Sequence, residues 1–251
     1  MKKTLAAFLL LAGAGAGACS SSSNDATATN DAGTANDAGT GDETGTTPGG
    51  GCTAARAALL GSVDSESKAT LSVIDSSGSA KTFYLDASAG GPSGAAKQSY
   101  TFLKLGGPEL ASVTDVSSQT STDWDLAVKR SVLYTNDGTG GPGTGGAVEI
   151  SKDFDSVTMA DATGATLGTE AFLDDDCNPA LDPAGSPLTT FSTWYDYDQS
   201  THVLTPHAGT WIVKGGTGTF YKLEILDWYA APDGGTGAGE GGTFSIKVAA
   251  L

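Results

Sequence analysis

The sequence predicts an all-β fold, an antiparallel β-sandwich or distorted barrel of many short strands preceded by a disordered tether. Short runs in which apolar and polar residues alternate recur along the chain, and Gly, Pro, Asn and Asp bound them. Glycine is abundant, at 36 of 251 residues, and gathers between these runs. Many short strands joined by glycine-rich turns favour a sandwich or barrel over a fold of alternating strands and helices.

The N-terminus resembles a secretory signal. Lys2 and Lys3 precede a short apolar run, Leu5–Ala12, and a run of small residues then ends at Cys19. The apolar run is too short and the segment too rich in glycine for a stable membrane span. We expect residues 1–18 to be a signal peptide that is removed.

Small residues directly before Cys19 resemble the cleavage box of bacterial lipoproteins. We therefore expect Cys19 to be lipidated. Acyl chains on this residue would together anchor the chain stably in a membrane. Ser20, which follows, resembles the pattern of lipoproteins passed on to the outer membrane. The alternative is an ordinary secreted protein in which a cysteine stands at the cleavage point.

Residues 19–51 have the composition of a disordered tether. Positions 20–51 contain no Ile, Leu, Val or aromatic residue, and Asn-Asp-Ala occurs three times at a six-residue period. Such a segment buries too little apolar surface to offset the entropy of ordering. The folded domain is therefore expected to span residues 52–251.

The net charge excludes some partners. The chain carries 13 Lys and Arg against 29 Asp and Glu, so the formal charge is 13 − 29 = −16. Two of these bases and five of these acids precede residue 52, which leaves 11 − 24 = −13 for the folded domain. A strongly acidic surface argues against nucleic acid and against docking on anionic lipid through a basic patch.

Cysteine usage agrees with export. If Cys19 is lipidated, Cys52 and Cys177 remain as an even pair. In an oxidising compartment we expect a disulfide between them, with two buried free thiols as the alternative. Neither has a second cysteine at metal-binding spacing.

Alternation and turn chemistry define the expected elements. Two helices are indicated, Thr53–Leu60 and, less clearly in the pattern, Pro108–Val113. Gly215–Gly218 is expected to be a hairpin loop. The expected strands are Thr70–Asp75, Lys81–Asp86, Ser99–Leu105, Trp124–Val128, Ser131–Thr135, Thr193–Tyr197, Trp211–Lys214, Phe220–Trp228 and Thr243–Ala249.

The motifs of common enzymes are missing. No Gly-x-Ser-x-Gly elbow occurs, and the glycine-rich stretch 138–146 lacks the Lys-Ser/Thr of a phosphate loop. Asp174, Asp176 and Asn178 are spaced like the start of a calcium loop, but Pro179 stands where that loop needs glycine. We therefore expect a protein that is not an enzyme.

Soft metal ligands are few outside the signal region. The candidates are His202, His207 and Met159. As the alternative, both histidines are solvated turn residues and Met159 fills the inner face of a strand. Aromatic residues gather late in the chain, where they form either a core or an aromatic wall for a flat ligand or a sugar. These are Trp194, Tyr195, Tyr197, Trp211, Tyr221, Trp228 and Tyr229.

Two blocks resemble the HmuY family. DWDLAVKRSVLYTNDGTGGPGTGGA (123–147) is similar to the family's Trp-Asp strand, basic turn and glycine-rich loop. WYDYDQSTHVLTPHAGTWIVKGGTGTFYKLEILDWY (194–229) resembles its C-terminal half. The resemblance implies an antiparallel β protein that binds haem iron between two axial ligands, His in some members and Met in others, and passes haem to an outer-membrane receptor.

His202 and His207 share one segment, with a turn expected between them at Thr205-Pro206, so they cannot easily clamp both faces of one haem. The expected ligand set is therefore His202 or His207 with Met159. The overall expectation is a haem-binding, non-catalytic outer-membrane lipoprotein of the cell envelope that serves iron acquisition. The alternative is a surface adhesion or glycan-binding β module that kept the fold and lost haem ligation.

Overall fold

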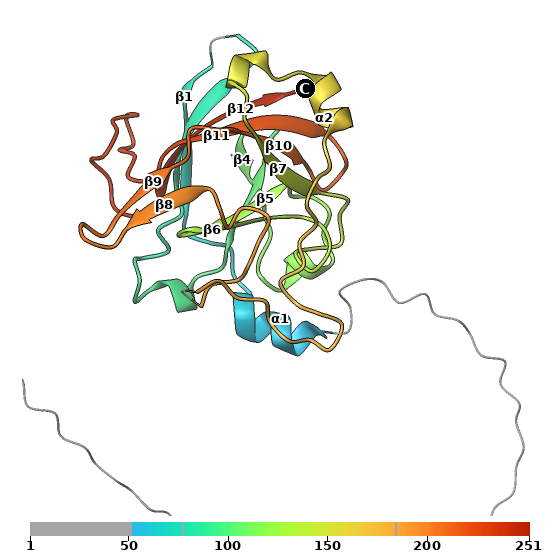
Figure 1. Ribbon diagram of the computed structural model, residues 1–251. Coiled ribbons are helices and arrows are strands. Elements are labelled where there is room, and N and C mark those ends of the chain that lie inside the picture. Colours follow the sequence, from blue (N-terminus) through green and yellow to red (C-terminus); the bar gives the residue numbers. More distant parts are fainter. Residues whose placement is uncertain (1–51, 77, 184) are drawn as a thin grey trace, which may run out of the picture. The chain divides into compact units, whose positions relative to one another are not determined.

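The computed structural model describes residues 52–76, 78–183 and 185–251 (Figure 1). These residues form antiparallel sheets with few helices, so the expected all-β, sandwich-like fold is confirmed. The signal peptide, the tether and Cys19 lie outside the described residues. Within the described ranges, no helix combines the length and the apolar character that crossing a membrane requires.

Twelve strands and two α-helices make up the described part of the chain. The helices are α1 (Thr53–Leu60) and α2 (Met159–Gly164). The strands are β1 (Thr70–Asp75), β2 (Lys81–Asp86), β3 (Thr101–Lys104), β4 (Glu109–Leu110), β5 (Leu126–Lys129), β6 (Val132–Thr135), β7 (Gly146–Ile150), β8 (Tyr195–Asp198), β9 (Val203–Pro206), β10 (Thr210–Lys214), β11 (Phe220–Asp227) and β12 (Thr243–Ala250).

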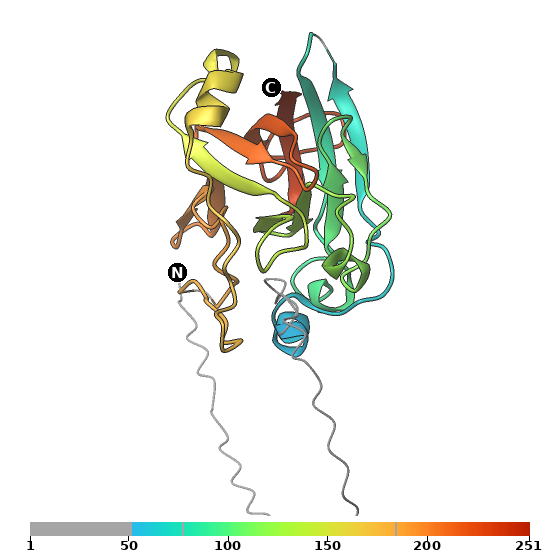
Figure 2. The ribbon, with the colours of Figure 1, turned by 90° about the vertical axis from the view of Figure 1, so that its right-hand side faces the viewer.

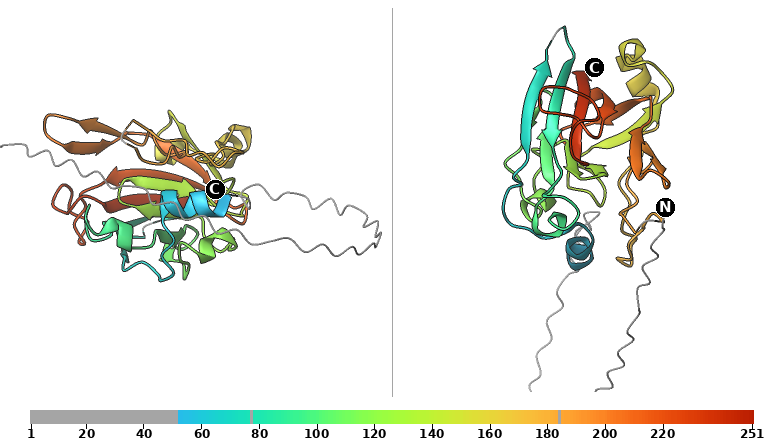
Figure 3. Two further views of the ribbon diagram at one scale, coloured as in Figure 1. Left: turned by 90° about the horizontal axis from the view of Figure 1, so that it is seen from below. Right: turned by 90° about the vertical axis from the view of Figure 1, so that its left-hand side faces the viewer.

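The strands form one large sheet, one smaller sheet and a separate hairpin. The six-stranded sheet has the order β1-β2-β12-β11-β10-β7, the four-stranded sheet has the order β4-β3-β5-β6, and β8 pairs with β9. In Figures 2 and 3, α1 lies at one end of the domain and α2 at the other. Every pair of hydrogen-bonded strands is antiparallel, both where a short turn joins them, as in β5–β6 and β8–β9, and where they are far apart in the chain, as in β2–β12.

The main core lies between the two larger sheets. Strand β11 alternates strictly, so that Leu223 and Ile225 point inward while Lys222 and Glu224 point outward. Their inward neighbours come from both sheets, which is what a sandwich requires. The fully buried members include Phe83, Leu85, Leu103, Leu126, Val128, Leu133, Val213, Phe244 and Ile246.

The other face of the smaller sheet carries an aromatic cluster. Edge-to-face contacts join Phe102 to Trp124, Trp124 to Tyr134, and Tyr134 to Phe172, with ring centroids 4.9 to 5.7 Å apart. Phe172 comes from the long segment after α2, so the cluster fastens that segment to the sheet. Such pairs add stabilisation beyond the area that they bury.

The late aromatic residues are core residues for the most part. All four tryptophans are buried, and the most exposed of them, Trp228, reaches only 8%. Tyr197 is the exception, since it is 52% exposed. The expectation of an aromatic wall of exposed tryptophans is therefore wrong, because alternation turns these side chains toward the space between the sheets.

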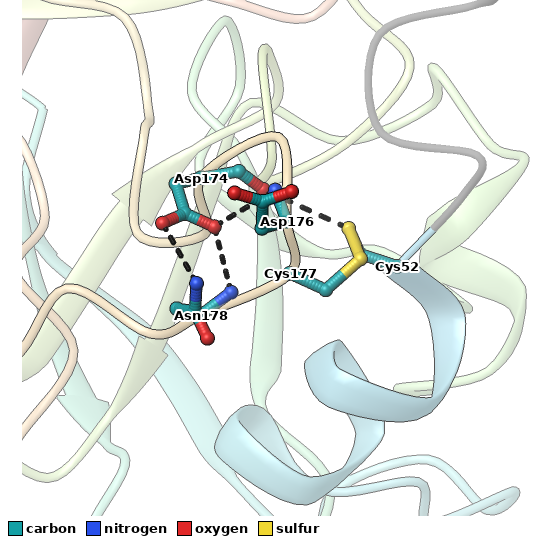
Figure 4. Close-up of a disulfide and its surroundings, with 5 residues drawn as sticks. All are labelled: Cys52, Asp174, Asp176, Cys177 and Asn178. Atoms are coloured by element: carbon teal, nitrogen blue, oxygen red, sulfur yellow. Dashed lines mark hydrogen bonds between the residues drawn. A yellow bond between two sulfur atoms is a disulfide. The ribbon is translucent and has the colours of Figure 1, made fainter.

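Helix α1 has the bounds that the sequence predicted, and a disulfide fixes its first turn. Cys52 is bonded to Cys177, with an S–S distance of 2.00 Å, so the expected pairing is present (Figure 4). Arg56, which is buried, donates to the carbonyls of Thr139 and Gly140 at 3.2 and 2.7 Å. Covalent and hydrogen bonds thus join α1 to two segments far along the chain.

Two local predictions are wrong. Pro108–Val113 contains the short strand β4 rather than a helix, because the preceding glycines turn the chain back and Leu110 pairs with Leu103. The turn expected at Thr205-Pro206 is the end of strand β9. Its proline is tolerated there because it closes the strand at the edge of a two-stranded sheet.

Besides β4 and β9, two further elements were not expected. Strand β7 follows directly on the glycine-rich loop, whose glycines hide its alternation. Met159, interpreted as a possible inward-facing strand residue, instead opens helix α2 and is 43% exposed. The physical reason is a capping box, in which Thr158 and Asp161 bond each other's backbone N–H groups.

We expect the disulfide to be a major source of stability. Cys52 and Cys177 are 125 residues apart in sequence, so the bond restricts a long loop of the unfolded chain. The double variant Cys52→Ser, Cys177→Ser should lose about 4 kcal/mol of unfolding free energy. Urea unfolding followed by tryptophan fluorescence measures the loss. Dithiothreitol should destabilise the parent chain to the same extent and leave the double variant unchanged; equal stability of both chains would contradict the assignment.

Candidate functional site

The two histidines lie at opposite ends of the β8–β9 hairpin. Register pairs Tyr195 with Pro206 at the base and Asp198 with Val203 next to the turn. The turn therefore spans residues 199–202, which puts His202 at the tip and leaves His207 beyond the base. The hairpin extends from the body of the domain in Figure 1.

Asp198 organises the tip of the hairpin. Its carboxylate accepts hydrogen bonds from the backbone N–H and the hydroxyl of Ser200, each at 2.7 Å. These bonds, together with those of Thr201, lower the pKa of Asp198 to about 2. The N–H of His202 donates to the carbonyl of Asp198 at 2.8 Å, so the turn is closed on both sides. The tip is thus held in one shape by its own side chains.

His202 combines an uncommon backbone with a directed side chain. Its φ of 59° lies in the left-handed region, which non-glycine residues rarely adopt. Its Nδ1 lies 2.7 Å from the hydroxyl of Tyr197. When Nδ1 carries the proton and donates to Tyr197, the lone pair is on Nε2, and no other described residue bonds that atom. This is the arrangement that metal-binding histidines use to fix the tautomer.

His207 is engaged differently. Its backbone N–H donates to the carbonyl of Trp194 at 2.9 Å, which ties it to the base of the hairpin. Its Nε2 lies 3.2 Å from a carboxylate oxygen of Asp196, and a third of its side chain is exposed. Nε2, which has no partner among the described residues in His202, is therefore engaged by Asp196 in His207.

Met159 and His202 belong to separate elements of the structure. Met159 is the first residue of α2, whereas both histidines belong to the hairpin. Figures 1 and 3 place α2 and the tip of the hairpin at opposite ends of the domain. Because α2 and the tip of the hairpin are far apart in these views, one iron could be shared by Met159 and His202 only if α2 or the hairpin moved.

The hairpin presents apolar and acidic side chains to solvent. Tyr197 and Val203 are 52% and 43% exposed, while Leu204 is buried in the main core. The N–H of Leu204 also donates to the hydroxyl of Tyr229 at 3.2 Å, which fixes the inner face of the hairpin. The register pairs Tyr197 with Leu204 and Asp198 with Val203, so Tyr197 is on the same face as Leu204 and Val203 is on the opposite face. Asp196 and Asp198 are exposed, and residues 195–206 include no Lys or Arg.

The acidic loop beside the disulfide does not form a metal site. Asp174 accepts hydrogen bonds from the backbone and side-chain nitrogens of Asn178, at 2.7 and 3.1 Å (Figure 4). These bonds lower the pKa of Asp174 and satisfy the turn internally. Among the described residues, no group of three or more His, Cys, Asp or Glu side chains could hold a metal ion.

A buried pair of carboxyl groups was not anticipated from the sequence. Glu170 is 1% exposed and accepts from the N–H and hydroxyl of Thr190, at 3.1 and 2.5 Å. The hydroxyl of Thr135 lies 3.2 Å from Glu170 and 2.6 Å from Asp137. This hydroxyl has one proton and can donate it to only one of the two carboxyl groups at a time. Burial raises the pKa of Glu170 to about 7 and also raises that of Asp137. No local pattern marks a carboxyl whose partners lie 20 to 35 residues away.

A family model and several solved structures are similar to this chain. The model of the family described as HmuY protein matches residues 96–240. A lipoprotein structure from Bacteroides fragilis is similar at 16% identity and a TM-score of 0.43, covering 70% of this chain and 92% of that one. A Bacteroides vulgatus structure, described as an HmuY-like haem-binding protein, is 18% identical at a TM-score of 0.44, covering 74% and 97%.

Another similar structure is the apo form of the HmuY analogue of Tannerella forsythia, at 16% identity and a TM-score of 0.37. It is covered over 80% of its length, and 61% of this chain is covered. No curated protein matches the chain.

We expect Glu170 to make the stability depend on pH. Its pKa rises from an ordinary 4.5 to about 7 on folding, so its contribution is fully present below pH 4.5 and is lost as pH rises through about 7. The shift corresponds to roughly 3 kcal/mol. Urea unfolding measured between pH 4.5 and 8 should show this fall in the parent chain. The fall in unfolding free energy should be much smaller in Glu170→Gln and as large in Glu224→Gln as in the parent chain. An equal fall in all three chains would contradict the assignment.

Proposed function

We propose, from the premise that this chain belongs to the HmuY family, that it binds haem as cargo in the manner of a haemophore and catalyses no reaction. The family match over residues 96–240 is the observation that carries the proposal. That range includes the whole β8–β9 hairpin and α2, and therefore all three candidate ligands.

His202 is the candidate axial ligand that the hairpin geometry favours. The Tyr197 hydroxyl can accept a hydrogen bond from Nδ1–H, and in that tautomer Nε2 carries the lone pair and has no partner among the described residues. Neutral imidazole is a common ligand of haem iron. The exposed tip gives a bulky planar ligand access without rearrangement of the core.

The surroundings of His202 suit one side of a porphyrin. Tyr197 is an exposed aromatic side chain in contact with His202, and a porphyrin face laid on it would bury apolar area on both molecules. Asp196 and Asp198 would repel the haem propionates. The propionate edge should therefore point away from the hairpin strands, toward solvent or toward cations elsewhere.

The second axial position is proposed to stay open to a donor from outside the hairpin. His207 is held to Asp196, and Met159 lies on α2, so neither faces the iron position next to His202 in this arrangement. Met159 and His207 remain the other candidate ligands of this chain.

The cellular role follows from the sequence at the N-terminus. Lipidation at Cys19 would attach the protein to the outer membrane, and residues 20–51 would act as a spacer of low hydrophobicity. A tethered haem carrier could then meet an outer-membrane receptor within the reach of that spacer. The lipid anchor, the receptor and iron acquisition are parts of this proposal.

Titration of the full chain with haemin tests the proposal. We expect a sharpened Soret band, with affinity lowered at least 10-fold in His202→Ala because the iron loses its protein ligand. Tyr197→Phe should weaken binding by about 10-fold, as loss of an orienting partner does at other metal sites. Met159→Leu should bind as the parent chain does.

His207→Ala is the matched control for the loss of an imidazole. If His207→Ala loses the Soret change while His202→Ala keeps it, His207 is the ligand. A loss confined to Met159→Leu would assign the thioether. A titration of the parent chain without any Soret change would refute haem binding.

A further inference from the structure

The other histidine and the methionine of the folded domain lie away from the tip that carries His202. The two axial ligand atoms of one haem iron are about 4 Å apart, since each metal–imidazole bond is about 2 Å long. His207 follows the base of the hairpin, and the strand from base to tip spans about 10 Å. Met159 opens α2, which Figures 1 and 3 place at the opposite end of the domain from the tip. In this arrangement a second ligand for iron bound to His202 must come from another molecule.

The tip of the hairpin is accessible to a second molecule. Every residue from 196 to 203 is exposed, and the hairpin extends from the body of the domain in Figure 1. The carboxylate of Asp198 accepts hydrogen bonds from Ser200 and Thr201, which hold the turn in one shape. The turn therefore needs no rearrangement to present His202, and two copies of the chain can bring their tips to opposite faces of one haem.

The coordination of haem iron suits two identical ligands. Its two axial positions lie on opposite faces of the porphyrin, so a two-fold axis that lies in the porphyrin plane and passes through the iron exchanges them. In a dimer with this symmetry both copies contribute the same side chain. In each copy Nδ1 of His202 can donate to the hydroxyl of Tyr197, 2.7 Å away, which leaves Nε2 to bind the iron. The half-exposed ring of Tyr197 would bury apolar area on its own face of the porphyrin.

We propose that two copies of this chain hold one haem between them, with Nε2 of His202 from each copy bound at one axial position of the iron. The inference rests on the proposed function and names the donor that completes the coordination of the iron. The exposed tip, residues 196–203, is smaller than a stable protein interface, which takes roughly 20 to 30 residues from each partner. The iron–nitrogen bonds must then supply most of the affinity, and the two copies should separate without haem.

Electrostatic repulsion opposes this association. Each folded domain carries 11 − 24 = −13, and residues 195–206 include Asp196 and Asp198 but no Lys or Arg. The hydrogen bonds from Ser200 and Thr201 lower the pKa of Asp198 to about 2, so this carboxylate is charged at neutral pH. Two tips at one haem would bring such charges together, and added salt screens the repulsion between them. The fraction of haem-bound dimer should therefore rise with the concentration of NaCl.

Sedimentation velocity of the full chain, with and without haemin, tests the proposal. We expect monomers without haemin, a species of twice the mass with it, and a Soret titration that ends at one haem for two chains. Excess imidazole should convert the dimers to haem-bound monomers, because it takes the place of His202 of the second copy. Zinc protoporphyrin, whose metal takes a single axial ligand, should bind without forming dimers.

His202→Asn should form no haem-bound dimers, and it should stay folded because asparagine adopts a positive φ readily. The controls His207→Asn, which also removes an imidazole, and Met159→Leu should form dimers as the parent chain does. Haem bound by monomers, at one haem for each chain, would overturn this inference and leave the proposed function intact, whereas a titration without any Soret change would refute both. Dimers that form equally with and without haemin, or that persist in His202→Asn, would also overturn the inference.

Discussion

The packing of two antiparallel sheets against each other is the interaction on which the other features depend. Strands β2, β11 and β12 present buried apolar side chains toward those of β3, β5 and β6, and these side chains meet in one core. The hairpin β8–β9 has only two strands and would be marginal by itself. It is stable where it lies because Trp194 and Leu204 belong to that same core.

Three attachments hold the long segment after α2 on this framework. Phe172 packs into the aromatic cluster, Glu170 collects hydrogen bonds from Thr135 and Thr190, and Cys177 is bonded to Cys52. The first is apolar, the second is electrostatic and the third is covalent, so they respond to different conditions. A change of pH alters the protonation of Glu170, and a reductant breaks the disulfide. Neither acts directly on the aromatic cluster.

Left-handed backbone conformations mark the places where this framework carries special side chains. Four non-glycine residues have positive φ in the described part of the chain: Ala89, Arg130, Cys177 and His202. Cys177 forms the disulfide, His202 is the candidate haem ligand, and the guanidinium of Arg130 contacts the Gly241 carbonyl and lies over the Trp228 ring. Strain of this kind persists only where the surrounding structure holds it in place. At the hairpin tip the hydrogen bonds of Asp198 do so, and at Arg130 the pairing of Lys129 with Val132 does.

Local patterns in the sequence were sufficient for much of the fold. All nine expected strands contain or overlap a strand of the structure, and α1, β1 and β2 have the expected bounds. Alternation predicts strands well where one face is buried, as in β11. It failed where glycine masked the pattern, at β7, and where two residues are too few to show any period, at β4.

The sequence by itself determined the fold class, the family and the identity of the scarce soft ligands. The tertiary structure alone decided which of those ligands can meet. Spacing along the chain allowed Met159 to lie opposite a histidine, but the capping box placed it on α2, away from the hairpin. The tertiary structure also decided that Tyr197 reaches His202 and that Glu170 lies next to Asp137. The physical reason is that propensity and alternation depend on near neighbours, whereas a site depends on distances between segments that only the packing of the sheets determines.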